Sequence, residues 1–219
     1  MMNNLSPVVK NLILINVLVF AGTNLMPSFL GEDFVNTWLA VHYPESEYFQ
    51  AFQLVTYMFM HGSIMHIFFN MFGLYMFGPP IEYTWGSKRF LIYYFITGLG
   101  ALALDFVVKY YQIYHTNISP EEVSDLVNTP MVGASGAIFG LLAAYGYLFP
   151  NNIIMPLFPP IPMKAKYFVL LYAAIEVYSG ISNMAHSTSN IAHFAHVGGA
   201  LFGSLLILYW HKGGRIGMD

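Results

Sequence analysis

Long apolar runs without charged side chains divide this chain. Asp, Glu, Lys and Arg are absent from four stretches, 11–31, 48–81, 126–163 and 177–211. An apolar run of ~20 residues is long enough to cross the hydrocarbon core of a bilayer as a helix. The pattern therefore predicts six membrane spans, at 8–26, 62–83, 90–109, 135–149, 165–182 and 190–211. Long loops are expected at 27–61 and 110–134, and the capping box at Ser119–Glu122 predicts a short helix in the second loop.

The composition supports an all-α membrane protein built as one domain over residues 1–219. Of the 219 residues, 57% are hydrophobic and 9% are charged, whereas roughly 25% are charged in an average soluble domain. The net charge of −3 offers little attraction to phosphate backbones, which argues against a nucleic-acid partner. Cysteine is absent from the sequence, which excludes disulfides, thiolate metal sites and a cysteine nucleophile.

The basic residues predict how the chain is oriented in the membrane. Cytoplasmic segments of membrane proteins carry an excess of Lys and Arg. With both termini cytoplasmic, Lys109 alone of the eight basic residues lies outside, and the two long loops carry most of the acidic side chains. We therefore expect cytoplasmic amino and carboxyl termini and outer long loops. A bacterial inner membrane is the expected location.

Several polar side chains are predicted at a similar depth inside the membrane. With a rise of ~1.5 Å per residue across a core of ~30 Å, Ser135 lies about 8 Å, His66 about 5 Å and His196 about 9 Å below the outer surface. Asn70 shares a helical face with His66, and His193 precedes His196 by three residues. Ionisable groups inside a membrane are costly and are functional candidates by default.

Ser135 has the surroundings of a nucleophile. It begins the fourth predicted span between Gly133 and Gly136, where the free N–H groups of a helix start can bind an anion. A hydroxyl beside such donors suits acyl transfer. Small residues four apart, Gly136 with Gly140 and Gly199 with Gly203, would let the fourth and sixth spans approach closely.

Other interpretations of these residues remain open. His66 and Asn70 could only tie helices together, and His193 with His196 could form half of a metal site with His66. A proton-relaying channel would use the same histidines, although the spans below them are almost wholly apolar. Glu176, midway through the fifth span, could make a buried structural hydrogen bond or gate access to substrate.

Three motifs resemble those of the rhomboid family of intramembrane serine proteases. They are Gly-Ala-Ser-Gly at 133–136, His-x-x-Gly-x-x-x-Gly at 196–203, and a segment at 61–70 that contains His61, His66 and Asn70. The resemblance covers residues 8–211 and implies a six-transmembrane-helix rhomboid-like bundle. It implies that Ser135 is the nucleophile and His196 its general base. His66 and Asn70, with the N–H of Ser135, would form the oxyanion hole.

The resemblance also implies supporting roles for other residues, and the sequence differs from the family at one motif. Phe139 holds a position where family members often have a Tyr stacked on the catalytic histidine, and Glu82 matches a structural carboxylate. The family's first-loop Trp-Arg pair is replaced by Phe52-Gln53, so the anchoring of that loop does not carry over. The implied supporting residues are Gly133, Gly136, Phe139, Gly199, Gly203 and His61.

The expected function is serine endopeptidase cleavage of membrane-spanning protein substrates near the outer membrane face by a Ser–His dyad. No carboxylate is expected near His196 at its depth, so packing against Phe139 and its neighbours would hold the ring. Neither a metal nor a cofactor is expected. The alternative is a catalytically silent rhomboid-like protein that binds or chaperones membrane helices.

Overall fold

The computed structural model describes residues 5–25, 37–157, 159–182 and 190–214, and this part of the chain is mainly helical. The elements are α1 Pro7–Leu25, α4 Gln53–Thr56, η2 Tyr57–Phe59, α5 Ile64–Trp85, α6 Ser87–His115, α7 Pro120–Asn128, α8 Ser135–Leu148, β1 Ile153–Ile154, β2 Met163–Lys164, α9 Ala165–Ser182 and α10 Asn190–Lys212. The two short strands pair antiparallel, with Ile153 opposite Lys164.

Each of the six predicted span ranges contains a helix. Within the described residues, four helical segments are long and apolar enough to cross a membrane: α1, α5, α6 and residues 192–212 of α10. Helix α8 is apolar but shorter, with 14 residues. Helix α6 continues to His115, so six residues assigned to the second loop are helical. The number of helices that cross the membrane stays a prediction.

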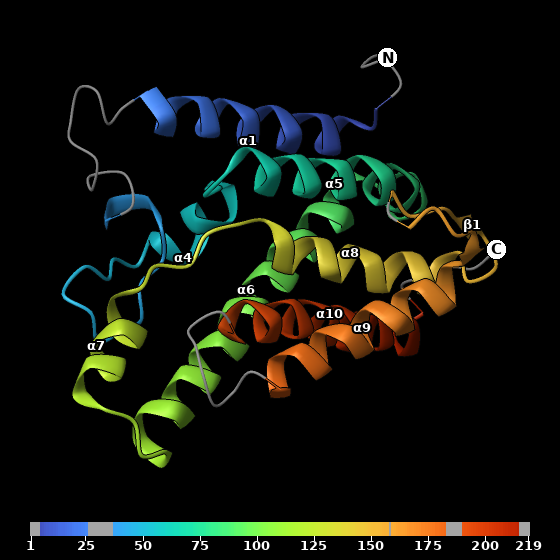
Figure 1. Ribbon diagram of the computed structural model, residues 1–219. Helices are drawn as coiled ribbons and strands as arrows, with labels where there is room; N and C mark the ends of the chain where they lie inside the picture. Colours follow the sequence, from blue (N-terminus) through green and yellow to red (C-terminus); the bar gives the residue numbers. More distant parts are fainter. Residues whose placement is uncertain (1–4, 26–36, 158, 183–189, 215–219) are drawn as a thin grey trace.

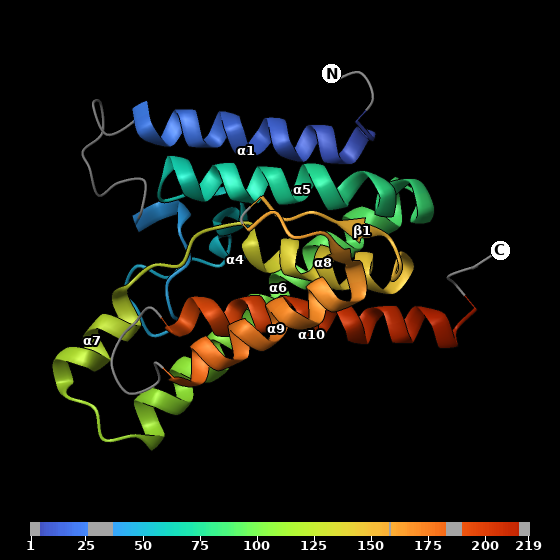
Figure 2. The same ribbon diagram turned by 45° about the vertical axis from the view of Figure 1, so that its right-hand side comes forward.

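The helices are arranged around α8 (Figures 1 and 2). Helix α1 lies at one edge, beside α5. Helices α9 and α10 lie together on the opposite side, and α6 passes obliquely behind α8. The start of α1 and the end of α10 lie at the same end of the bundle in both views. Which side of a membrane this end faces stays a prediction.

Local sequence signals explain where several helices begin and end. Ser63 precedes α5 with an extended backbone, and its hydroxyl accepts a hydrogen bond from the His66 N–H. The predicted capping box is confirmed: Ser119 and Glu122 exchange hydrogen bonds at the start of α7. Gly86 separates α5 from α6 with φ of 79°, a conformation that side chains with a Cβ rarely adopt.

Glu82 joins α5 to the start of α1. Its side-chain oxygens accept hydrogen bonds from the N–H groups of Val8 and Val9, each at 3.0 Å, and from the Ser87 hydroxyl at 2.6 Å. The first N–H groups of a helix have no partner within the helix. Glu82, which is buried, therefore caps α1 from a neighbouring helix. This confirms the structural hydrogen bonding expected of it.

Gln53 organises the described part of the first long loop. Its side-chain amide donates to the carbonyls of Thr37 and Tyr48, both at 2.9 Å, and its oxygen accepts from the N–H of Gln50 at 3.1 Å. The Gln53 side chain is fully buried, whereas the preceding Phe52 is exposed. Although Gln53 stands where many family members have Arg, it holds this loop together.

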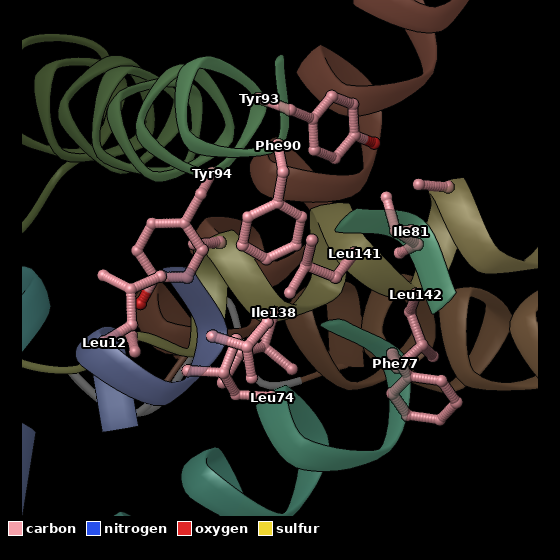
Figure 3. Close-up of a cluster of buried hydrophobic side chains, with 14 of the residues drawn as sticks. Leu12, Leu74, Phe77, Ile81, Phe90, Tyr93, Tyr94, Ile138, Leu141 and Leu142 are labelled. Carbon is pink, nitrogen blue, oxygen red and sulfur yellow. The ribbon is translucent and has the colours of Figure 1, made fainter. Parts of the chain in front are cut away.

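A cluster of buried apolar and aromatic side chains joins α1, α5, α6 and α8 (Figure 3). It includes Leu12, Leu74, Phe77, Ile81, Phe90, Tyr93, Tyr94, Ile138, Leu141 and Leu142. The Tyr93 hydroxyl donates to the carbonyl of Gly140 at 2.7 Å, which satisfies this buried polar group and ties α6 to α8.

Candidate active site

Ser135 is the first residue of α8, and the backbone before it turns sharply. Gly133 has φ of 127°, which only glycine adopts without strain, and its N–H donates to the carbonyl of Tyr57 at 2.9 Å. This hydrogen bond fixes the turn against η2. The N–H groups of the first turn of α8 lie beside the Ser135 hydroxyl and have no partner within the helix. They could bind a developing negative charge.

The hydroxyl of Ser135 faces His196 of α10. Ser135 Oγ lies 2.9 Å from His196 Nε2, a hydrogen-bonding distance. Phe139, one turn further along α8, stacks on the imidazole with ring centroids 4.3 Å apart and an interplanar angle of 6°. Helix α8 therefore provides both the hydroxyl that meets one ring edge and the aromatic face that fixes the ring plane.

Glycines bring α8 and α10 into contact. A Cβ placed on Gly199 would clash with the backbone carbonyl of Gly136, so the two helices touch through their main chains. Gly136 also leaves no room for a side chain beside Ala101 of α6, and Gly203 lies against Tyr93 of α6. The predicted close approach of α8 and α10 is present at Gly136 and Gly199, whereas Gly140 and Gly203 face α6.

His66 and Asn70 of α5 line the same cavity as Ser135 and His196. A Cβ at Gly133 would lie 2.8 Å from His66 Nε2 and 3.7 Å from Ser135 Oγ, so both groups flank the same side of the turn. The Asn70 amide donates to the His66 carbonyl at 3.0 Å. The structure thus brings together all four residues expected to act as nucleophile, base and oxyanion donors.

The cavity has a volume of about 610 Å³ and lies between α5, α8, α9 and α10. Apart from the polar groups at Ser135, its lining is mainly apolar and aromatic, including Phe69, Phe77 and Tyr172. An apolar pocket with a few converging polar groups is typical of a binding or active site.

His61 lies beside this site in the connection before α5. Its ring centroid is 5.0 Å from that of His66, and its side chain is 5% exposed. Burial, with a smaller contribution from neighbouring His66, lowers the pKa of His61 to about 4. Its ring packs edge-on against His66 of α5, and a role in bracing the first loop stays a prediction.

The expectation that no carboxylate lies near His196 is wrong. Glu176 of α9 places Oε2 3.1 Å from His196 Nδ1 and 2.6 Å from His193 Nδ1. The depth argument used for the other residues could have found it. Glu176 precedes Ser182, the last residue of α9, by six positions, or about 9 Å along the helix, a depth similar to that estimated for His196.

Glu176, His193 and His196 also have the composition of a metal site. One ligand atom from each lies within 4.8 Å of the others. The sequence suggested a metal site that combines His193 and His196 with His66, whereas the structure groups these two histidines with Glu176 of α9. In the structure Glu176 contacts each of the two histidines directly, at hydrogen-bond and ion-pair distances.

The arrangement has the parts needed for acyl transfer. A serine hydroxyl contacts an imidazole, helix-start N–H groups lie beside the hydroxyl, and two further polar side chains face the same cavity. A base within hydrogen-bonding reach of a nucleophile, itself oriented by a third group, is the usual pattern of nucleophilic catalysis.

Comparisons with known proteins agree with the sequence resemblance. Rhomboid protease AarA of Providencia stuartii is 32% identical over 161 residues, covering 71% of this chain and 56% of that protein. RHOMBOID-like protein 12, mitochondrial, of Arabidopsis thaliana is 30% identical over 168 residues, covering 73% and 46%. Rhomboid protease GlpG of Klebsiella pneumoniae subsp. pneumoniae is 35% identical over 105 residues, covering 48% and 36%.

The chain spans about half the length of the curated relatives it matches. A family model described as the rhomboid domain matches residues 48–213, which include the Ser135 turn, the cavity and α10. The family match and the apolar helices identify an integral membrane protein. Relatives named as mitochondrial and chloroplastic leave the choice of membrane a prediction. The chain belongs to the rhomboid family.

Proposed function

We propose that this protein is an intramembrane serine endopeptidase that cleaves membrane-spanning proteins near the outer membrane face. The observation that carries the proposal is the 2.9 Å contact between Ser135 Oγ and His196 Nε2 at the cavity between four helices. The names of relatives such as Rhomboid protease AarA support the same activity.

The first chemical step joins Ser135 to the substrate. The Ser135 hydroxyl transfers its proton to His196 Nε2 as its oxygen attacks the carbonyl carbon of the scissile peptide. Negative charge on the carbonyl oxygen is stabilised by the N–H of Ser135 with His66 and Asn70, donors whose effect is large in a water-poor site. When the C–N bond breaks, His196 returns the proton to the leaving amine.

Water completes the reaction. A water molecule gives one proton to His196, its oxygen attacks the acyl carbon, and Ser135 recovers the proton as the bond to the acyl group breaks. The apolar part of the cavity would hold an apolar substrate segment beside Ser135. Contact between two apolar surfaces removes no charged group from water, so it carries no cost of burying charge.

Substitution of the nucleophile tests the proposal. We expect Ser135→Ala to abolish cleavage of a single-span substrate by purified, reconstituted protein while thermal unfolding stays close to wild type. Wild-type protein should be labelled by a serine-directed fluorophosphonate, and Ser135→Ala should not. His196→Ala should lose cleavage in the same assay.

Two outcomes would reject the proposal. Cleavage that persists in Ser135→Ala would show that another group is the nucleophile. Wild-type protein that folds but neither cleaves nor reacts with the fluorophosphonate would favour the silent helix-binding alternative.

A further inference from the structure

Glu176 contacts both histidines of α10 through one oxygen. Its Oε2 lies 2.6 Å from His193 Nδ1 and 3.1 Å from His196 Nδ1. All three side chains are largely enclosed, with exposures of 12% for Glu176, 20% for His196 and 31% for His193. The carboxylate therefore lies on the edge of the His196 ring opposite to Ser135, which contacts Nε2.

The chemistry of His196 requires a defined tautomer. To accept the serine proton, Nε2 must carry no hydrogen, so the proton of the neutral ring must be on Nδ1. His196 Nδ1 is buried and makes no hydrogen bond to any residue that the structure describes. The 3.1 Å separation nevertheless places the carboxylate within reach of that N–H after a small ring rotation. Hydrogen bonds in catalytic sites often tighten only when substrate is bound.

Phe139 and Glu176 constrain the ring in different ways. Stacking on Phe139 fixes the plane of the imidazole but does not distinguish its two nitrogens. A carboxylate at one edge favours the tautomer with a proton at that edge, and it stabilises the imidazolium formed when Ser135 is deprotonated. The two contacts together orient Nε2 toward Ser135.

His193 in turn holds the carboxylate. It precedes His196 by three residues on α10, so both rings lie on neighbouring faces of that helix. The shorter of the two contacts is the one to His193, which fixes Oε2 between α9 and α10. His193 is therefore placed to act on His196 through Glu176.

We propose that Glu176 is a positioning residue for His196, completing a Ser135–His196–Glu176 triad in which His193 orients the carboxylate. This inference rests on the proposed protease function and adds a third member to the dyad.

Kinetics of Glu176 variants test the positioning role. We expect Glu176→Gln to lower kcat by about 10- to 100-fold, less than the ~10⁴-fold loss for the corresponding Asp→Asn change in chymotrypsin-type triads, because this contact is less well aligned. KM should stay within about twofold of wild type, since the interaction is made chiefly in the transition state. The rate of fluorophosphonate labelling of Ser135 should fall with kcat.

Variants of His193 test the connection through Glu176. His193→Ala should lower kcat several-fold, and His193→Gln, which keeps a donor, should recover part of the loss. The double variant Glu176→Gln/His193→Ala should be no slower than Glu176→Gln alone, because residues that act through one another are not additive.

Glu82→Gln is the matched control. Glu82 is also a carboxylate of the helix bundle, but it caps α1 and does not line the cavity. We expect this variant to unfold at lower temperature while the folded fraction keeps the wild-type kcat and labelling rate. A purely structural role of Glu176 would give the same result for Glu176→Gln.

The outcomes separate the two proposals. If wild-type protein cleaves and is labelled at Ser135 but Glu176→Gln has wild-type kcat, the positioning role is rejected and the protease function stands. Additive losses in the double variant would reject the role of His193 through Glu176. If wild-type protein neither cleaves nor is labelled, the protease function fails and the positioning role fails with it.

Discussion

Phe139 determines the plane of the imidazole on which the proposed chemistry depends. Its ring lies parallel to that of His196 at 4.3 Å. Phenylalanine keeps the aromatic face of the Tyr often found at this position in the family but has no hydroxyl. The ring is thus contacted by the stacked Phe139 of α8 and by the carboxylate of Glu176 from α9.

Substitution of Phe139 measures the contribution of the stack. An aromatic pair contributes about 0.5–1.5 kcal/mol beyond its buried area, so Phe139→Ala should lower kcat by roughly 3- to 10-fold through a less ordered imidazole. Phe139→Tyr should keep a kcat near wild type, as measured with the reconstituted protein. An unchanged kcat in Phe139→Ala would mean that the stack does not orient the base.

His61 predicts that stability depends on pH. Its folded pKa of about 4 lies below the ordinary histidine pKa of 6.5, so the unfolded chain binds more protons between these pH values. The contribution of His61 to the free energy of unfolding is therefore fully present above about pH 6.5. It is lost as the pH drops toward 4, by on the order of 3 kcal/mol at most. Thermal unfolding in detergent should show this loss, and His61→Phe should reduce it. Equal pH dependence in both proteins would contradict the assignment.

Most individual residues of the candidate site could be predicted from the sequence. Ser135, His66 and His196 were found because polar groups in a membrane are few and their depths can be compared. Glu176 was recognised as costly, and its depth matches that of His196, but depth alone does not show how α9 rotates against α10 and so which side chains meet. Gln53 gave no signal, since an uncharged amide in a loop carries no periodicity or charge from which its partners could be predicted.

Helices α8 and α10 meet along glycines, and this contact is the element on which the site depends. At Gly199 the main chain of α10 touches the carbonyl of Gly136, and at Gly140 the α8 backbone lies against Thr97 of α6. Small residues at such interfaces let backbones approach and gain van der Waals contact. The separation of Ser135 and His196 is a consequence of this fit.

Gly199→Ala should separate the two helices. Because the clashing atom belongs to the backbone, a helix must move, and overpacking of this kind costs typically about 1–3 kcal/mol. Displacement of a catalytic group by ~1 Å can cost about 10²-fold in rate, so we expect both a lower unfolding temperature and at least a tenfold loss of kcat.

Gly22→Ala in α1 is the matched control for that substitution. Nothing lies within 4 Å of a Cβ at Gly22, and Ala is favoured over Gly in a helix by about 1 kcal/mol. This variant should be as stable as wild type or more stable, with unchanged kcat. If Gly199→Ala and Gly22→Ala changed the unfolding temperature and kcat equally, the α8–α10 contact would not be what determines them.

For the whole molecule, the sequence predicted where helices form better than how they assemble. Apolar runs with few charges located all six helical ranges, since a bilayer demands apolar segments whatever their partners. The extension of α6 to His115 was missed because its last turns carry polar and aromatic residues that look like a loop. The cavity between α5, α8, α9 and α10 depends on packing between distant segments, which periodicity along one helix does not encode.

The main-chain contact at Gly199 has a consequence for how lipids influence this protein. Changes in bilayer thickness are absorbed by helix tilt at modest cost, and helices joined through side chains can slide or tilt against each other. The helices that carry the hydroxyl and the imidazole are instead locked at one crossing point. Under the proposed protease function, lipid chain length should therefore govern the arrival of a membrane-embedded substrate, whereas the acyl-transfer step should be insulated from the surrounding lipid.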